Sequence, residues 1–144
     1  MTEGSIRLAT DADAVLAAGD LFDSAPLADA TRAFLDDPNH VLFIAYDGEM
    51  PAGFVSGVLV THPDKGTEMF LYELSVREEL RRRGIGTALV NALRDLAIER
   101  GCYDMWVLTD ADNAAALATY IGTGASDRED TVMLTWHFDR GAQP

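Results

Sequence analysis

The sequence has a single cysteine, Cys102, so no intramolecular disulfide can form. Chains without disulfides are typical of the reducing cytoplasm, and we expect this protein to be cytoplasmic. No apolar run approaches the roughly 20 residues that a membrane-spanning helix needs. The first residues, MTEGSIRL, have neither the basic start nor the apolar stretch of a signal peptide, so we expect no secretion signal.

Basic residues are also scarce. The chain has 11 Lys and Arg against 24 Asp and Glu, which gives a formal net charge of -13. Such a surface repels nucleic acid and anionic membrane, so we expect neither as a partner, and it attracts cations. A need for solubility explains the same charge equally well. The histidines His40, His62 and His137 show no metal-ligand spacing, and we expect no metal.

Repeats, low-complexity stretches and internal linkers are absent, so residues 1–138 should form one domain, followed by a flexible tail over residues 139–144. Thr10 should cap the first helix, with Asp13 three residues on. Strands are expected at residues 5–9, 40–46, 52–61, 69–76, 104–109 and 131–138, and helices at residues 11–22, 28–36, 85–100 and 113–121. Strands joined by turns and then alternating with helices predict an α+β fold, in which helices pack on a mixed sheet.

A glycine turn lies between a predicted strand and a predicted helix. Gly84 and Gly86 let the backbone turn tightly and approach a ligand closely. The first amides of the helix have no partner within the helix, and the helix dipole adds partial positive charge there. Arg81, Arg82 and Arg83 add cationic side chains. The turn therefore predicts a pyrophosphate site, with an ordinary basic turn as the alternative.

The turn, read as Arg81-x-x-Gly84-x-Gly86, resembles the [Gln/Arg]-x-x-Gly-x-[Gly/Ala] signature of the GNAT superfamily of N-acetyltransferases. In that family the turn binds the pyrophosphate of coenzyme A, and the strand before it holds the pantetheine arm. The resemblance implies a mixed central sheet with an antiparallel N-terminal meander and a splayed parallel pair at its centre, flanked by helices. It implies acetyl-CoA as co-substrate, bound by Leu74, Ser75, Val76, Arg81, Arg82, Arg83, Gly84, Ile85, Gly86, Thr87, Asn113, Ala116 and Tyr120.

A second stretch resembles the same family. Residues 113–124 read Asn-x-x-Ala-x-x-Thr-Tyr-x-x-x-Gly, similar to the family's Asn-x-x-Ala-x-x-Leu-Tyr-x-x-x-Gly-Phe. Thr119 replaces the usual Leu and Ala125 the usual Phe, both at packing positions. The family's matching tyrosine lies near the sulfur, so Tyr120 is the expected catalytic acid for the thiolate leaving group. The alternative is a core tyrosine with a satisfied hydroxyl.

The base that deprotonates the amine has two candidates. Glu73 interrupts an apolar strand, where a carboxylate is costly to bury unless it is paired or faces a cleft. Asp110 is expected at the end of the next strand, so both acids should meet in one pocket that binds an ammonium. The alternatives are a salt bridge from Glu73 to a nearby arginine and a helix cap at Asp110. Which of the two removes the proton stays open.

A closer resemblance concerns the acceptor. Residues 71–76, 81–89 and 109–112 resemble gentamicin-type aminoglycoside 3-N-acetyltransferases. This implies acetylation of the 3-amino group of an aminoglycoside antibiotic, which confers resistance. Glu73, Asp110 and Asp112 would bind the cationic acceptor. The alternatives are another amine (a polyamine, an amino acid or a protein amine) and a non-catalytic acyl-CoA-binding sensor. A homodimer is compatible with the sequence, which does not show the oligomeric state.

Overall fold

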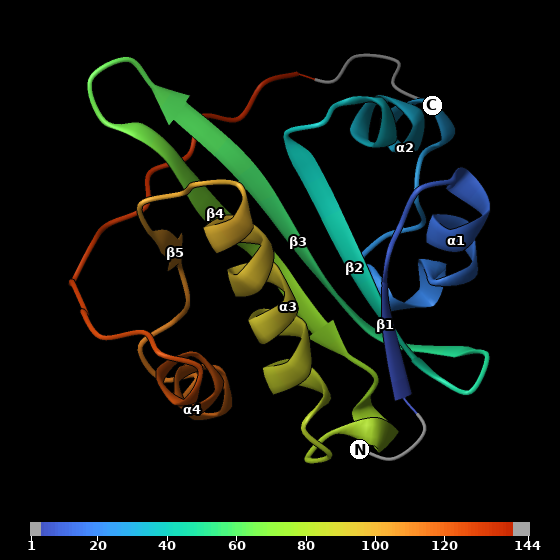
Figure 1. Cartoon of the computed structure of the whole chain (residues 1–144). Coiled ribbons are helices and arrows are strands. Elements are labelled where there is room, and N and C mark those ends of the chain that lie inside the picture. Colours follow the sequence, from blue (N-terminus) through green and yellow to red (C-terminus); the bar gives the residue numbers. More distant parts are fainter. Residues whose placement is uncertain (1–3, 140–144) are drawn as a thin grey trace.

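The computed structural model describes residues 4–139, and a five-stranded sheet in the order β1-β2-β3-β4-β5 forms its centre (Figure 1). The strands are β1 (Gly4–Leu8), β2 (His40–Asp47), β3 (Met50–His62), β4 (Gly66–Val76) and β5 (Met105–Val107). The helices are α1 (Ala12–Ala17), α2 (Ala28–Asp36), α3 (Ile85–Glu99) and α4 (Ala114–Gly122), with single 3-10 turns η1 (Gly19–Leu21) and η2 (Glu78–Leu80).

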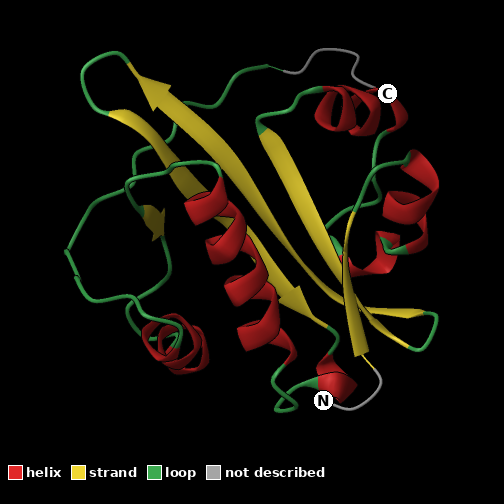
Figure 2. Ribbon diagram, viewed as in Figure 1, coloured by secondary structure: helices red, strands yellow, loops and turns green. Residues whose placement is uncertain are grey.

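The first four strands form an antiparallel meander, and β5 lies parallel to β4 after the crossover through α3. Helices flank the sheet, as Figure 2 shows by colour. The predicted α+β fold, with an antiparallel meander and a parallel pair, is therefore confirmed. The alternation of neighbouring residues in β3 produces the two cores: Val55 packs with the buried residues of α3, and Phe54 with those of α1.

A glycine allows the close approach of α3 to the sheet. A Cβ on Gly57 of β3 would lie 2.8 Å from both Leu93 Cδ1 and Met69 Sδ, which is too close for any real side chain. Leu93 and Met69 are both fully buried. A larger residue at position 57 would therefore push α3 away from the sheet, and with it the turn at the beginning of α3.

A β-bulge in β4 separates the two parallel strands. Tyr72 is an extra residue between Leu71 and Glu73, which pair with adjacent residues of β3. A bulge bends its strand and increases the local twist. Pairing of β4 with β5 ends just before the bulge, where Leu71 pairs with Val107. Beyond it, residues 73–76 pair with β3 on one side only, and their other edge is open.

The N-terminal helix differs from the prediction. Asp11, not Thr10, caps α1, because its Oδ1 accepts a hydrogen bond of 2.9 Å from the N–H of Ala14. The helix also ends at Ala17 and is followed by η1, whereas a single helix was expected over residues 11–22. Gly19 at the start of η1 has a low helix propensity, which favours the break.

The predicted strand over residues 131–138 was wrong. These residues have no regular secondary structure, and Val132, Leu134, Trp136 and Phe138 are 74–84% exposed. Alternation specifies which face of a strand is apolar but not which edge it pairs with, and no described strand pairs with this segment. As a result β5 is the edge strand of the described sheet, and the parallel pair is not at its centre. Apart from Asp139, the predicted tail over residues 139–144 lies outside the described residues.

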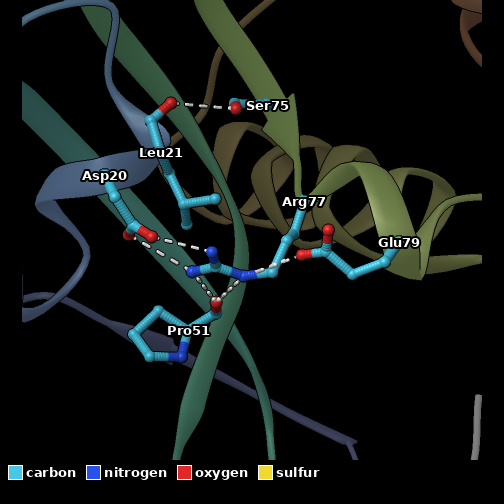
Figure 3. A network of polar contacts seen from close by, with 6 residues as sticks. All are labelled: Asp20, Leu21, Pro51, Ser75, Arg77 and Glu79. Carbon is cyan, nitrogen blue, oxygen red and sulfur yellow. Dashed lines mark hydrogen bonds and ion pairs between the residues drawn. The ribbon is translucent and has the colours of Figure 1, made fainter.

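Arg77, directly after β4, anchors η1 to the sheet (Figure 3). Its guanidinium donates hydrogen bonds of 2.7 and 3.2 Å to the carboxylate of Asp20. The same group donates at 3.1 and 2.8 Å to the carbonyl oxygen of Pro51 in β3. The hydrogen bond from Arg77 holds the pKa of Asp20 below its ordinary value. Nearby, Ser75 Oγ donates to the Leu21 carbonyl at 3.0 Å, so two side chains at the end of β4 hold η1 in place.

We expect Arg77→Met to lower the free energy of unfolding by about 2 kcal/mol, because hydrogen bonds of a charged group contribute roughly 1.5–3 kcal/mol. Arg32→Met is the matched control, because Arg32 forms an exposed ion pair with Asp29. The side chains of Arg32 and Asp29 are 69% and 100% exposed. Such exposed pairs contribute little to stability. Urea denaturation of the two variants measures the difference, and equal losses would contradict the anchoring role of Arg77.

Candidate active site

The beginning of α3 has the backbone conformation of an anion site. Gly84, its N-cap, has a φ of +80°, which glycine adopts without strain. Arg82 has a φ of 65°, which is uncommon for a residue with a side chain. No side chain caps α3, and the first intrahelical bond runs from the N–H of Ala88 to the Gly84 carbonyl. The amides of residues 85–87 are therefore left to bind a ligand.

The three arginines of the turn differ in their surroundings. Arg81 Nε donates to the carbonyl oxygen of Val76 at 3.2 Å and so ties the turn to the end of β4. Arg82 and Arg83 are exposed and form no ion pair with a carboxylate of the described chain. Both guanidinium groups are thus available to an anion. Ile85 is only 3% exposed, so its amide, and not its side chain, faces the turn.

Three elements converge at Gly86. A Cβ at this position would lie 3.7 Å from Val76 Cγ2 and 3.9 Å from both Leu74 Cδ2 and Thr119 Cγ2. Leu74 and Val76 belong to the part of β4 whose edge is open, and Thr119 belongs to α4. These are ordinary van der Waals distances, so a methyl group could be accommodated at this position. A larger side chain would come too close to the three neighbouring residues. Position 86 thus lies where the beginning of α3, the open part of β4 and α4 come together.

The second sequence motif forms α4. Asn113 is its N-cap, and its Oδ1 accepts a hydrogen bond of 3.1 Å from the N–H of Ala116. The structure thus joins two predicted cofactor-binding residues to each other and explains their spacing by helix capping. Tyr120 lies half-buried on the same helix, and this burial raises the pKa of its hydroxyl group. The hydroxyl therefore stays protonated at neutral pH and can donate a proton.

Two cavities meet at Tyr120, which lines both. The first, of about 250 Å³, lies between α3, β5 and the end of α4, and most of its lining is apolar. The second, of about 520 Å³, is lined by the loop from β5 to α4 and by residues 125–131. Its size lies within the range of small-molecule sites. Its charged lining consists of the carboxylates Asp110, Asp127, Glu129 and Asp130 and the single guanidinium Arg128.

Glu73 is half-buried beside a second acid. Burial, followed by the negative charge of Asp23, raises the pKa of the Glu73 carboxyl. Glu73 forms no salt bridge within the described residues, so the predicted alternative of a bridge to an arginine is not observed. Asp23 follows η1, which Arg77 holds against the sheet. Sequence reasoning missed Asp23, because only this long-range anchoring brings it to the end of β4.

The structure does not bring Glu73 and Asp110 into one pocket. Strand β5 ends at Val107, so Asp110 lies in the following loop and not at a strand end as expected. Asp110 is exposed and lines the larger cavity, which Glu73 does not line. Asp112 is exposed in the same loop and lines neither cavity. The candidate site therefore has two acidic regions, one at Glu73 and Asp23 and one at the larger cavity.

No helix among residues 4–139 combines the length and apolar character needed to cross a membrane. Over the same stretch of chain, no three His, Cys, Asp or Glu residues are grouped as metal ligands would be.

A mixed sheet whose parallel strands part beside an uncapped helix N-terminus is the geometry of an acyl-CoA-dependent transferase fold. Residues 11–124 match the sequence profile of the acetyltransferase (GNAT) family, and the chain belongs to that family. N-acetyltransferase 8B of Rattus norvegicus is 30% identical over 99 residues, which cover 68% of this chain and 45% of that protein. The chain spans about half the length of the curated relatives it matches.

Solved structures of aminoglycoside acetyltransferases share the fold. The enzyme meta-AAC0020 from an uncultured soil metagenomic sample, in complex with sisomicin, superimposes with a TM-score of 0.86 at 20% identity, over 94% of this chain and 97% of that one. Aminoglycoside N-acetyltransferase AAC(6')-Iy in complex with CoA superimposes with a TM-score of 0.77 at 21% identity, over 93% and 95% of the two chains. Identities this low show a common fold and leave the acceptor open.

We expect Gly86→Val to weaken coenzyme A binding at least about tenfold, equivalent to roughly 1.4 kcal/mol, because its side chain would crowd Leu74, Val76 and Thr119 next to the free amides of residues 85–87. Gly122→Val is the matched control, since a side chain at that position of α4 would meet nothing within 4 Å. Calorimetric titration with coenzyme A measures both affinities. Equal affinities in the two variants would place the ligand elsewhere.

Proposed function

We propose that the protein transfers an acetyl group from acetyl-CoA to an amine of an aminoglycoside. The observation that carries the proposal is the position of Tyr120, which lines an acid-walled cavity and belongs to α4, the helix whose Thr119 lies with Leu74 and Val76 around Gly86. Tyr120 would thus donate a proton to the leaving thiolate and also line the binding site of a polycation. An acyl-CoA sensor without catalysis would need neither feature.

The residues present fit acetyl-CoA. The uncapped amides of residues 85–87 and the exposed guanidinium groups of Arg82 and Arg83 would hold its pyrophosphate. The open backbone edge of residues 73–76 would hold its extended arm by hydrogen bonds, as a sheet edge accepts an added strand. Gly86 keeps the space between them open. Acetyl-CoA, when bound, supplies the thioester from which the acetyl group is transferred.

Glu73 is the base we propose. A carboxylate with a raised pKa is a stronger base than an ordinary one. Asp23 beside it adds a second negative charge, so the pair attracts the ammonium form of the amine and Glu73 then accepts its proton. Asp110 is exposed and lies in the larger cavity, and we propose that it binds the acceptor.

The charge of the larger cavity supports a polycationic acceptor. Its lining contains four carboxylates and only one guanidinium, and the chain has a formal net charge of -13. An aminoglycoside carries several ammonium groups on a compact framework and suits an open acidic cavity of this kind. The structural relatives include enzymes described as aminoglycoside acetyltransferases, among them one with sisomicin. The 3-amino group as the acetylated position is supported by the sequence resemblance alone, since these relatives do not favour it.

Tyr120→Phe should lower kcat about a hundredfold, because it removes the proton donor for the thiolate, and general acid catalysis contributes at least about that factor. The KM for acetyl-CoA should change little, since only the hydroxyl is lost. Steady-state thiol release at several pH values measures both constants. Tyr103→Phe, which removes the hydroxyl of a 51% exposed tyrosine, is the control and should behave as wild type. An unchanged kcat for Tyr120→Phe would return this residue to a packing role.

Two acidic variants test the acceptor end. Glu73→Gln should lower kcat and remove the acidic limb of the kcat/KM profile, because the rate rises with pH as the Glu73 carboxyl loses its proton. Asp110→Asn should raise the acceptor KM and weaken its dependence on salt, since it removes one screened charge from the cavity. Glu99→Gln, which changes the net charge equally at the far end of α3, is the matched control. NMR of the product of a 3-amino aminoglycoside locates the new acetyl group.

The outcomes separate the parts of the proposal. Wild-type kinetics in both variants would show that the acceptor binds elsewhere. Acetylation at another nitrogen would keep the acceptor class and reject the 3-amino position. Acetylation of spermidine or a peptide, but of no aminoglycoside in a panel, would keep the reaction and reject the acceptor. Coenzyme A binding without any thiol release would leave a sensor.

A further inference from the structure

The face of the sheet that packs against α1 contains a buried hydroxyl group without a partner. Ser56 of β3 is 7% exposed, and its Oγ has no hydrogen-bond partner among residues 4–139. A buried polar atom that is left unpaired lowers stability by the full cost of removing it from water. Native proteins pair the large majority of such atoms, so the hydroxyl of Ser56 needs an explanation.

The cross-strand neighbours of Ser56 are apolar on one side and acidic on the other. Residues that pair across antiparallel strands point to the same face, with Cβ atoms about 4.5–5.5 Å apart. Ser56 pairs with Leu42 of β2, which is 3% exposed, and with Glu73 of β4. Phe54, two residues before Ser56 and on the same face, is fully buried. Of the two cross-strand partners, only Glu73 has a side chain that can bond the hydroxyl.

A second serine on this face has a different environment. Ser75 pairs with Phe54 and lies two residues after Glu73. Its Oγ donates to the carbonyl oxygen of Leu21 at 3.0 Å, so this hydroxyl holds η1 in place (Figure 3). Ser56 makes no such contact within the described chain. Alanine at position 56 would leave no unpaired hydroxyl, so the stability of the fold does not account for serine there.

The side chain of Glu73 has both the freedom and the need to bond this hydroxyl. Glu73 directly follows the bulge at Tyr72, in the part of β4 that pairs with β3 alone, and it is half-buried. Rotation about its side-chain torsions is the one movement required. Burial and the negative charge of Asp23, after η1, raise the pKa of the carboxyl and so oppose its ionised form. A hydroxyl that donates to a carboxylate favours the ionised form.

We propose that Ser56 is the positioning residue of Glu73, and that its hydroxyl donates a hydrogen bond to the ionised carboxylate. The inference rests on the role of Glu73 as base in the proposed function. The bond would hold one carboxylate oxygen against the sheet and leave the other free to take the proton from the ammonium group of the acceptor. The proton moves from nitrogen to this second oxygen, and the neutral amine that remains can attack the thioester.

The first measurement is the titration of the Glu73 carboxyl in the full chain, by carbon-13 NMR of protein labelled in its glutamate side chains. The signal of Glu73 is the one that Glu73→Gln removes. We expect Ser56→Ala to raise the midpoint of this titration by about one pH unit, because a hydrogen bond to the charged form lowers the pKa of a carboxyl group. Ser56→Thr keeps the hydroxyl and should titrate as the wild type does.

Two controls separate the hydroxyl from packing. Thr31→Val removes a hydroxyl from another buried residue, which is 8% exposed on α2, and should leave the Glu73 titration unchanged. Urea denaturation should show Ser56→Ala to be at least as stable as the wild type, since it loses an unpaired hydroxyl. An unchanged midpoint in Ser56→Ala would overturn the proposal. So would a midpoint in Ser56→Thr that moves as far as that of Ser56→Ala.

Kinetics connect this contact to the reaction. In Ser56→Ala the acidic limb of the kcat/KM profile should move to higher pH by the same amount as the titration, which lowers the rate on that limb about tenfold. The plateau and the KM for acetyl-CoA should stay as in the wild type, whereas a packing defect would lower the rate at every pH. The titration itself needs no acetyl transfer. A shifted midpoint in a protein without acetyl transfer would keep the contact and reject the proposed function, and acetyl transfer with an unmoved midpoint would do the reverse.

Discussion

The bulge at Tyr72 in β4 is the constraint on which the rest of the candidate site depends. One extra residue in β4 shifts its register against β3 and turns the strand away from β5, whose pairing ends at Leu71. The edge that opens is a row of backbone donors and acceptors within the sheet. Helix α3 begins beside the same edge, since its crossover starts where β4 ends. The open end of β4 and its position beside the beginning of α3 thus depend on one inserted residue.

Much of this could be predicted because the signals are local. The glycine turn and the helical spacing after it placed the start of α3 at Ile85, where the structure has it. The Asn-to-Gly spacing of the second motif placed α4 within one residue at each end, and Asn113 explains its start by capping. A turn and a cap involve only neighbours in the chain, so the sequence contains all the partners they need. The antiparallel meander could be predicted for the same reason, because turn residues separate its strands.

The parts that could not be predicted depend on distant partners. Asp23 and Glu73 are 50 positions apart, and they meet because Arg77 binds Asp20 and Ser75 binds Leu21. Asp110 was expected at a strand end, but β5 stops at Val107 after it loses its pairing with β4. The segment predicted as a strand over residues 131–138 has the right alternation but pairs with no described strand. In each case the local pattern is satisfied by several arrangements, and long-range packing selects one.

The Arg77 anchor has a consequence for how this protein can change over time. It joins the N-terminal segment to the sheet at η1, beside the apolar core that α1 and α2 share with one face of the sheet, while α3 and α4 are held through a separate core on the other face. Exposed residues of α1 and α2 can therefore change without disturbing the turn at Gly84, as long as the contacts of Asp20 and Leu21 with the end of β4 are kept. Selection for a new amine can act on one half of the molecule while the half that would handle the acyl donor stays under its own constraint. A family built in this way can diversify its acceptors and keep a single chemistry.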